Sequence, residues 1–346
     1  MCLLLPNNYL LEVKDLYIEF ERYAGSAKVL NGVSLNISAR ERVGLVGESG
    51  CGKSLTVKTI MGLLPEKRIK ISGEIKYKGQ EILEANDALR KKITGKEMVM
   101  IFQDPMTSLN PVFSIEKQMM ENIWWNYYPE SRGFSLFKKK SKKKKAELKA
   151  LIEKTLKEVR LSDTERILNS YPFQLSGGMR QRVLIAMALA SQPSLLIADE
   201  PGTALDVTTQ KQIVKLLDEL IRKKDLATLM ITHNLGLVRE NTDKVYIMYG
   251  GNIVESAATE KIFSNPLHPY TRGLLASVPK LTAEGVGSGI EGTVPNYFEV
   301  GEGCRFKPRC SYSIEKCKLQ RPELKAEEEG HFVACYNLPG KEENNG

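Results

Sequence analysis

Along most of the chain, segments with the apolar pattern of β-strands take turns with segments that have the apolar periodicity of α-helices. Strand-like apolar runs lie at residues 11–20, 29–38, 41–47, 72–82, 194–200, 227–233 and 244–255. Helical periodicity marks residues 53–64 and 208–224, and the segment from about 105 to 190 is mostly helical. Because strands alternate with helices, we expect an α/β fold with a parallel sheet.

The regular pattern fades from Asn265 onward, where prolines and glycines multiply. We therefore predict two parts, residues 11–264 and residues 265–346, the second being a small irregular extension. A length of 346 residues suits one large domain with an appendage, or two domains. No repeat of about 20 to 50 residues is present, which excludes solenoids and propellers.

Composition and charge narrow the class of protein further. The longest purely apolar run, Val183–Ala190, is far shorter than the roughly 18 residues of a membrane-spanning helix. The first residues lack a positive flank and contain Pro6, so we expect no secretory signal and a cytoplasmic location. In a reducing compartment, clustered cysteines are more often metal ligands than disulfides.

Much of the net charge of +8 comes from one lysine-rich run within residues 137–149. Without this run the charges nearly balance, which argues against a general nucleic-acid binder. The lysines at 138–145 are typical of a solvated insertion, and contact with anionic lipid headgroups is the alternative.

A glycine-rich loop joins the strand at 41–47 to the helix at 53–64. Its sequence GESGCGKS, Gly47–Ser54, fits the P-loop pattern GxxxxGKS in the strand–loop–helix context that the pattern requires. Glycines let backbone N–H groups turn toward phosphates, and the helix N-terminus adds its dipole. We expect Lys53 to reach the β- and γ-phosphates and Ser54 to bind Mg²⁺. The nucleotide contacts expected here are Gly47, Ser49, Gly50, Cys51, Gly52, Lys53, Ser54 and Thr56.

Two acids stand at the end of the apolar strand LLIADE. With a P-loop in the same chain, Asp199 is expected to hold the Mg²⁺ shell and Glu200 to polarise the attacking water. An apolar strand that ends in two acidic residues is common in proteins, and without the P-loop these two acids could simply be surface residues.

The segment LSGGMRQR puts Ser176, Gly177 and Gly178 at the start of a helix, which is a second phosphate-binding arrangement. Since the chain already has a P-loop, this second cradle would serve a nucleotide bound by another subunit, and function would require a dimer. The alternative is an ordinary serine N-cap followed by glycines.

Taken together, these motifs resemble the ATP-binding subunit of an ABC transporter from about Leu11 to Ile262. Their order is specific to that family: GESGCGKS matches Walker A, MIFQDP the Q-loop, LSGGM the signature, LLIADE Walker B, TALD the D-loop and ITH the H-loop. The resemblance implies a P-loop NTPase domain over residues 11–264, with a RecA-like core, an antiparallel β subdomain and a helical subdomain at about 105–190.

The resemblance also implies roles for single residues. ATP is expected between the Walker motifs of one subunit and the signature of its partner, with Asp206 of the D-loop beside it. His233 would contact the γ-phosphate, and Gln103 would link Mg²⁺ and water to the helical subdomain. Phe20 is expected to stack on adenine, with Tyr23 as the alternative. Gly202 stands where the family usually has threonine or serine, which concerns loop rigidity more than chemistry.

The tail resembles the extension of dipeptide and oligopeptide importer ATPases, a subfamily that also includes nickel, glutathione and oligosaccharide importers. The resemblance lies in NPLHPYTRGLLASVP, GCRFKPRC and HFVACY, and the methionine in LSGGMRQR fits the same subfamily. It implies import rather than export.

Four cysteines lie in this tail: Cys304, Cys310, Cys317 and Cys335. Their intervals are wider than the two to four residues, roughly, between paired zinc ligands, whereas four thiolates also suit a [4Fe-4S] cluster. A short tail that buries little apolar surface usually needs a staple. We expect a [4Fe-4S] cluster with a structural or redox-sensing role; zinc, free thiols and disulfides are the alternatives. His331 nearby is expected at the surface.

The chain is therefore expected to be an ATPase at the cytoplasmic face of a membrane that powers uptake of di- or oligopeptides. The expected partners are a second similar ATPase subunit or another copy of this chain, two membrane permease subunits and an extracytoplasmic solute-binding protein, without nucleic acid. Import of nickel or oligosaccharides is an alternative. A soluble ABC-type ATPase acting on nucleic acid or the ribosome is another, but the sequence lacks a long coiled-coil insertion and a second cassette.

Overall fold

The computed structural model describes residues 9–22, 25–64, 68–128, 142–203, 205–277 and 289–339. The chain divides into two compact units. Unit 1 combines Met1–Glu84 with Leu229–Gly346, and unit 2 is Ala85–Thr228. The two units are described separately below.

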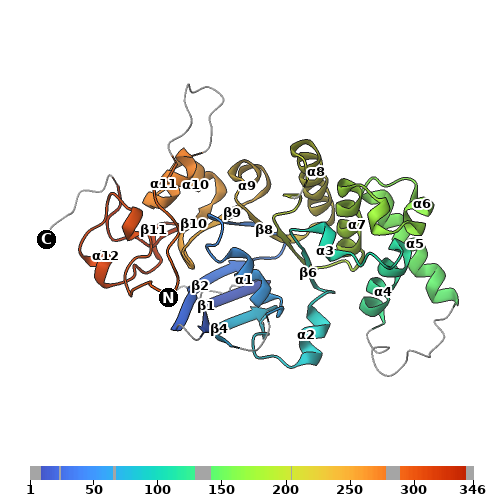
Figure 1. Ribbon diagram of the computed structural model, residues 1–346, viewed down its shortest axis with the longest axis horizontal. Helices are drawn as coiled ribbons and strands as arrows, with labels where there is room; N and C mark the ends of the chain where they lie inside the picture. The colour runs from blue at the N-terminus through green and yellow to red at the C-terminus, as the bar shows by residue number, and fades with distance from the viewer. Residues whose placement is uncertain are drawn as a thin grey trace, which may run out of the picture. The chain divides into compact units, whose positions relative to one another are not determined.

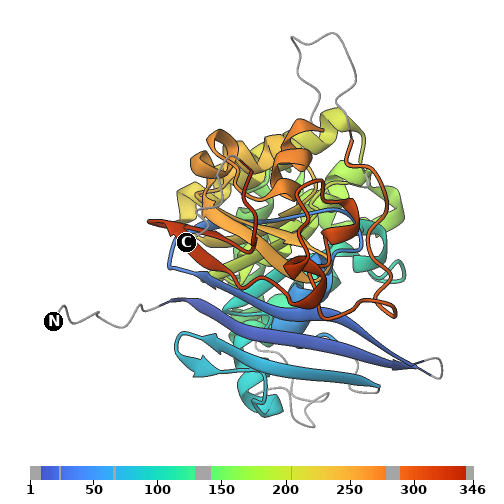
Figure 2. The same cartoon turned by 90° about the vertical axis from the view of Figure 1, so that its left-hand side faces the viewer.

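Unit 1 contains an antiparallel sheet in the order β2 (Gly25–Ile37), β1 (Leu11–Arg22), β4 (Ile69–Tyr77), β5 (Gln80–Glu81). Its long strands are the blue and cyan ribbons of Figure 2. Val13, Leu16 and Ile18 of β1 are buried, while Tyr17 between them is exposed. The sheet therefore has one face in the core and one face outside, as alternating strands require.

A second sheet of unit 1 has the order β11 (Lys325–Glu328), β12 (His331–Val333), β10 (Asn252–Ala258), β9 (Lys244–Tyr249), β3 (Arg42–Val46), β8 (Ala227–Thr232). β3 and β9 pair in parallel, with Val46 opposite Ile247, as the alternation of strands and helices predicts. β9 and β10 are antiparallel. The helices of this unit are α1 (Lys53–Ile60), α9 (Leu235–Asn241), α10 (Thr259–Ser264), α11 (Pro269–Ala276), the 3₁₀ turn η3 (Lys307–Arg309) and α12 (Lys316–Leu319).

The extension after residue 264 is less irregular than the sequence suggests, because two of its strands join this sheet. β12 pairs antiparallel with β10, with Val333 opposite Glu255. His331, expected at the surface, is instead fully buried, and its Nε2 lies 2.8 Å from Oε1 of Glu255. The surface expectation was wrong because Glu255 is itself fully buried and needs hydrogen-bonding partners there.

In unit 2, β6 (Met98–Ile101) pairs in parallel with β7 (Leu195–Asp199). Its helices are α2 (Asp87–Ile93), α3 (Pro105–Ser108), α4 (Ile115–Tyr127), α5 (Lys142–Glu158), α6 (Thr164–Asn169), η2 (Pro172–Gln174), α7 (Gly177–Ala190) and α8 (Val207–Lys224). The helices α4 to α7 gather into one group (Figure 1). Ile115, Ile152 and Val183 are fully buried in the cluster that joins α4, α5 and α7.

The lysine-rich run is described only in part. Residues 138–141 lie outside the described ranges, and Lys143, Lys144 and Lys145 are exposed in the first turns of α5. None of the helices in the described ranges combines the length and the apolar character needed to cross a membrane.

Candidate active site

The glycine-rich loop between β3 and α1 has a backbone that only glycine accommodates easily. Gly50 and Gly52 have φ of +81° and +108°, and Gly52 is the N-cap of α1. A Cβ at Gly47 would lie 2.1 Å from the carbonyl oxygen of Met248, and one at Gly52 would lie 2.7 Å from Leu30. The loop is thereby held close to β9 and β2, as a P-loop needs in order to turn its N–H groups inward.

Lys53 is buried at the first position of α1 and folds back onto this loop. Its ammonium donates hydrogen bonds of 2.7 Å to the carbonyl of Gly47 and 2.9 Å to that of Glu48. Its side chain thus brings a positive charge to the helix N-terminus, where a phosphate would find both the charge and the dipole.

The other predicted contacts of this loop divide into exposed and supporting residues. Ser49 is exposed and Ser54 is half-buried at the start of α1. Thr56 is fully buried, and its hydroxyl donates to the carbonyl of Gly52 at 3.0 Å, so this side chain braces the loop. Cys51 is fully buried, and burial raises the pKa of its thiol, which keeps it neutral.

The predicted adenine contact, Phe20, lies half-buried on β1 opposite Ala27 of β2. The alternative, Tyr23, lies outside the described residues.

At the end of β7, Asp199 is buried and Glu200 is half-buried with φ of +46°. The carboxylate of Glu200 accepts hydrogen bonds from the amide of Gln103 at 3.1 Å and from the hydroxyl of Thr203 at 3.4 Å. The Thr203 hydroxyl also lies 3.1 Å from the carbonyl oxygen of Glu200. The sequence predicted Gln103 and Glu200 separately, and the structure joins them, so that Glu200 is held in one orientation.

The loop that follows Glu200 leads to the N-cap of α8. Gly202 has φ of +93°, a conformation in which the threonine or serine usual at this position would be strained. Asp206 caps α8 by accepting from the N–H of Thr209 at 2.9 Å, and this bond holds the pKa of its carboxyl below its usual value. The Asp206 carboxylate is exposed, so its capping role leaves it open to a further partner.

The predicted second cradle is the N-terminus of α7. Ser176 is exposed, and its hydroxyl accepts from the N–H of Met179 at 3.3 Å. A Cβ at Gly177 would lie 2.7 Å from Leu205, and one at Gly178 would lie 2.8 Å from Thr209. Both glycines are therefore needed for close packing against the segment that begins α8, and the serine capping alternative also describes the observed geometry.

His233 is exposed and follows the last residue of β8 in unit 1. The next residue, Asn234, caps α9 by accepting from the N–H of Gly236 at 3.0 Å. The turn between β8 and α9 thus fixes the backbone that carries His233.

Sequence reasoning missed three residues of the extension that contact the P-loop, namely Tyr270, Tyr297 and Arg309. All three bond to Glu48 or Gly50. Tyr270 and Arg309 lie in the tail motifs NPLHPYTRGLLASVP and GCRFKPRC. No sequence signal indicated their contact with the loop, because even the nearest pair is separated by 222 residues.

The iron–sulfur prediction was wrong, and the same finding removes the zinc alternative. Among the described residues, no group of three or more His, Cys, Asp or Glu side chains is arranged to hold a metal ion. Cys304 and Cys310 pack against the cluster that contains Tyr249 and Phe306, and burial raises the pKa of the Cys304 thiol to about 11. Cys335 donates to the carbonyl of Asn337 at 3.1 Å, and burial raises its pKa to about 12.

Comparison with known families places the P-loop, Gln103, the signature and the acids at the end of β7 in one family model. The family model described as "ABC transporter" matches residues 30–203, and the model "Oligopeptide/dipeptide transporter, C-terminal region" matches residues 254–317. The chain belongs to the ABC transporter family. The predicted α/β P-loop fold and the predicted ATP-hydrolysing class are confirmed, and the family implies ATP and typically Mg²⁺.

Similar proteins cover nearly the whole chain. The oligopeptide transport ATP-binding protein AppD of Bacillus subtilis is 44% identical over 94% of this chain and 96% of its own. The dipeptide transport ATP-binding protein DppD of Bacillus subtilis is 41% identical over 94% of each chain. The oligopeptide transport ATP-binding protein OppD of Salmonella typhimurium is 42% identical over 96% of this chain and 94% of its own.

Among solved structures, the ATP-binding cassette MJ0796 in a dimeric post-hydrolysis state, bound to ADP and Pi, is 26% identical. The match covers 72% of this chain and 98% of that one with a TM-score of 0.58. The structure of cbiO1 from Clostridium perfringens is 23% identical, covers 75% of this chain and 92% of its own with a TM-score of 0.58, and shows the fold alone.

Proposed function

We propose that this protein is the ATP-hydrolysing subunit of an importer for dipeptides or oligopeptides. The observation that carries the proposal is the set of peptide-transport ATP-binding proteins 41% to 44% identical to it along 94% to 96% of the chain. The match of residues 254–317 to an oligopeptide/dipeptide transporter C-terminal region supports the same substrate class, because this region lies outside the general cassette.

Within unit 1, Lys53 and the N-terminus of α1 bind the β- and γ-phosphates, and the N–H groups between Gly47 and Ser54 surround them. Phe20 stacks on the adenine, and His233 contacts the γ-phosphate. The positive φ values of Gly50 and Gly52 and the buried ammonium of Lys53 support the phosphate contacts. The mechanism is electrostatic, because positive charge and backbone dipoles stabilise the transferring phosphoryl group.

Within unit 2, Glu200 accepts a proton from the attacking water, and the bonds from Gln103 and Thr203 orient its carboxylate for that step. In unit 2, Asp199 and Gln103 offer oxygen ligands of the kind that Mg²⁺ prefers. In unit 1, the hydroxyl of Ser54 offers another. When bound, Mg²⁺ neutralises phosphate charge. Ser176, Gly177 and Gly178, with Asp206, act on the nucleotide of a partner subunit, and the exposed N-terminus of α7 supports this role.

The partners proposed are a second ATPase subunit, either a similar chain or another copy, two membrane permease subunits and an extracytoplasmic solute-binding protein. The chain would sit peripherally at the cytoplasmic face of the membrane. The relatives are described as oligopeptide transport ATP-binding proteins, which supports a membrane assembly rather than action on nucleic acid.

The test is co-purification of the complex followed by ATPase measurements with the binding protein and candidate solutes. Stimulation by a peptide, and loss of turnover by about 100-fold or more in Glu200→Gln with ATP binding retained, would support the proposal. If only nickel or only an oligosaccharide stimulates ATP hydrolysis, that compound is the transported solute in place of a peptide. Normal hydrolysis by Glu200→Gln would remove Glu200 from its role, and co-purification with nucleic acid or ribosomes without membrane proteins would contradict the importer.

A further inference from the structure

Three side chains of the extension converge on two residues of the P-loop. The hydroxyl of Tyr270 accepts from the N–H of Glu48 at 3.0 Å, and the hydroxyl of Tyr297 donates to the carbonyl of Gly50 at 2.8 Å. Arg309 donates to both carboxylate oxygens of Glu48, at 2.7 and 3.1 Å. The loop is thus held through a backbone donor, a backbone acceptor and a side chain.

The guanidinium of Arg309 is held by other residues as well as by Glu48. Its Nε donates to the carbonyl of Glu291 at 2.7 Å, its Nη2 to that of Ile290 at 2.9 Å, and its Nη1 to the Tyr249 hydroxyl at 3.4 Å. With the two bonds to Glu48, all five N–H donors of the guanidinium are used. A Cβ at Gly292 would lie 3.1 Å from Arg309, so glycine at this position lets the chain wrap closely around it.

The contact differs from the surface ion pairs of the chain. The Arg309 side chain is 5% exposed and Glu48 is 26% exposed, whereas Lys70 and Glu21 in a typical surface pair are 70% and 50% exposed. A bidentate arginine–carboxylate pair away from water is strong and directional, whereas an exposed pair contributes little. The hydrogen bonds from Arg309 also raise its own pKa, so it stays charged.

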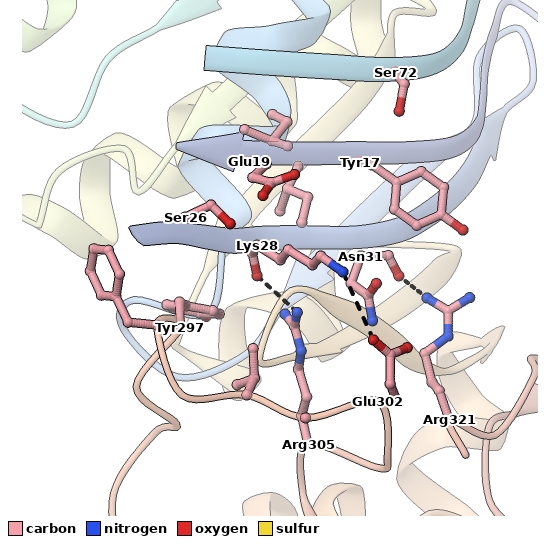
Figure 3. A pocket seen from close by; sticks show the side chains of 15 residues that line it. Tyr17, Glu19, Ser26, Lys28, Asn31, Ser72, Tyr297, Glu302, Arg305 and Arg321 are labelled. Atoms are coloured by element: carbon pink, nitrogen blue, oxygen red, sulfur yellow. Dashed lines mark hydrogen bonds and ion pairs between the residues drawn. The ribbon is translucent and has the colours of Figure 1, made fainter. Parts of the chain in front are cut away.

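The loop that carries Tyr297 is itself anchored to the antiparallel sheet. Figure 3 shows Arg305 reaching β2, where its Nη2 donates to the carbonyl of Lys28 at 2.8 Å. Between loop and sheet lies a cavity of about 620 Å³. Among the described residues that line it, none belongs to Gly47–Ser54, so this cavity is separate from the phosphate site. Because the loop is anchored, the position of Tyr297 is fixed where its hydroxyl can donate to the carbonyl of Gly50.

These contacts bear directly on the phosphate-binding lysine. Tyr270 holds Glu48 through its backbone N–H, and Arg309 holds it through its carboxylate. The carbonyl of the same residue accepts from the ammonium of Lys53 at 2.9 Å. An unpaired Glu48 carboxylate within the loop would also repel a triphosphate. Fixing and neutralising Glu48 therefore prepares the loop for the nucleotide and lowers the entropy lost on binding.

We propose that the extension holds the P-loop in its nucleotide-binding conformation and that Arg309 is the positioning residue. This inference rests on the proposed ATP site at Gly47–Ser54. It assigns to the extension an action on ATP affinity within the same chain, in addition to any role in the importer.

The test compares Arg309→Ala, Arg309→Lys and Arg321→Ala in the full chain. Arg321 is the matched control, because it is another arginine of the extension that bonds to residues distant in the sequence. Its partners are Asn31 and Asn252 rather than the P-loop. The measurements are the Kd for Mg-ATP by calorimetry, the urea midpoint of unfolding, and hydrogen exchange of the amides in residues 47–54. Tyr297→Phe, which removes one hydroxyl, serves if Arg309→Ala does not fold.

We expect Arg309→Ala to raise the Kd at least about fivefold and to speed exchange in the P-loop, with partial recovery in Arg309→Lys. Arg321→Ala should leave both unchanged even if it lowers the urea midpoint. Adding Glu48→Gln to Arg309→Ala should weaken binding less than the sum of the single changes.

A Kd for Arg309→Ala within about twofold of the parent, or equal to that of Arg321→Ala, would overturn the inference. If the parent chain binds Mg-ATP and Arg309→Ala binds equally well, only this inference fails. If the parent chain itself binds no nucleotide, the proposed ATP site fails with it.

Discussion

The amide of Gln103 donates a 3.1 Å hydrogen bond to Oε2 of Glu200, so the Q-loop glutamine holds the proposed general base. Glu200 has φ of +46°, a backbone conformation that side-chain-bearing residues rarely adopt. With the backbone fixed by the turn and the carboxylate fixed by Gln103 and Thr203, little freedom remains at this residue. A fixed base is what proton transfer from a bound water needs.

From this relationship we predict the effect of Gln103→Ala. The kcat for ATP should fall about tenfold, because the carboxylate of Glu200 loses its stronger partner. The Kd for Mg-ATP should rise by a smaller factor, because Gln103 is only one of the oxygen ligands proposed for Mg²⁺. Steady-state hydrolysis by the assembled complex, with separate nucleotide-binding measurements, checks the split. Gln212→Ala, an exposed glutamine on α8, is the control. An unchanged kcat would show that Glu200 does not depend on Gln103.

A second prediction concerns Lys53. Lys53→Ala should weaken Mg-ATP binding by roughly 30-fold or more, because a charge-assisted contact to phosphate is lost. Equilibrium binding with the full chain measures this. Lys58→Ala removes an exposed lysine from the same helix and should bind normally. Equal affinities for Lys53→Ala and Lys58→Ala would place the phosphates elsewhere.

A third prediction follows from His268, which burial holds neutral with a pKa lowered from 6.5 to about 3. The unfolded chain takes up this proton below pH 6.5 while the folded chain does not, so stability falls as the pH falls from 6.5 toward 3. His268→Asn should flatten the dependence by up to about 1.4 kcal/mol per pH unit. Asparagine can still accept from the N–H of Tyr270, as Nδ1 of His268 does, so the cap on α11 is kept.

Urea unfolding between pH 5 and pH 7 compares the two slopes, since this range lies largely within the window from 6.5 to about 3. The neighbouring Glu255, which accepts from the His268 N–H at 2.9 Å, is present in both proteins and cancels in the difference. Identical slopes would mean that His268 is protonated in the folded chain.

A fourth prediction concerns the buried carboxylate of Glu255. It accepts from the N–H groups of Leu267 and His268 at 2.8 and 2.9 Å, and Nε2 of His331 lies 2.8 Å from it. Glu255→Gln places an NH₂ group against one of these donors and should lower the free energy of unfolding by about 3–5 kcal/mol. Glu329→Gln, at an exposed position of the same region, should change it by less than about 0.5 kcal/mol. Similar values for the two variants would show that the buried network is not a stabilising unit.

The sequence was sufficient to predict the features whose signals are local. The glycines at Gly50 and Gly52, the strand that precedes them and the helix that follows form one short segment, and the structure has this order. Asp206 was expected from the family resemblance as a nucleotide contact, and its capping of α8 was not predicted. The signature serine was identified from the local sequence. Each of these depends on residues within one or two turns of the backbone.

The features that the sequence did not predict depend on contacts between distant segments. The contact between Arg309 and Glu48 spans 261 residues, and the burial of His331 depends on Glu255, 76 residues away. For the four tail cysteines the sequence led to a site that the structure does not contain among the described residues. Their number suggested metal ligands, but no metal-binding group is formed within the described ranges. Cys304 and Cys310 pack against a hydrophobic cluster, Cys317 is buried, and Cys335 donates to the carbonyl of Asn337.

Because β12 pairs with β10, the chain cannot be shortened at residue 264 without exposing the edge of the sheet. A chain cut after residue 264 would lose β12 and leave β10 as an open edge, with Ser256 and its neighbours free to pair with another molecule. It would also leave Glu255 buried without His331. The shortened chain is therefore expected to aggregate rather than to remain monomeric. The extension thus protects the edge of the sheet from pairing with another molecule.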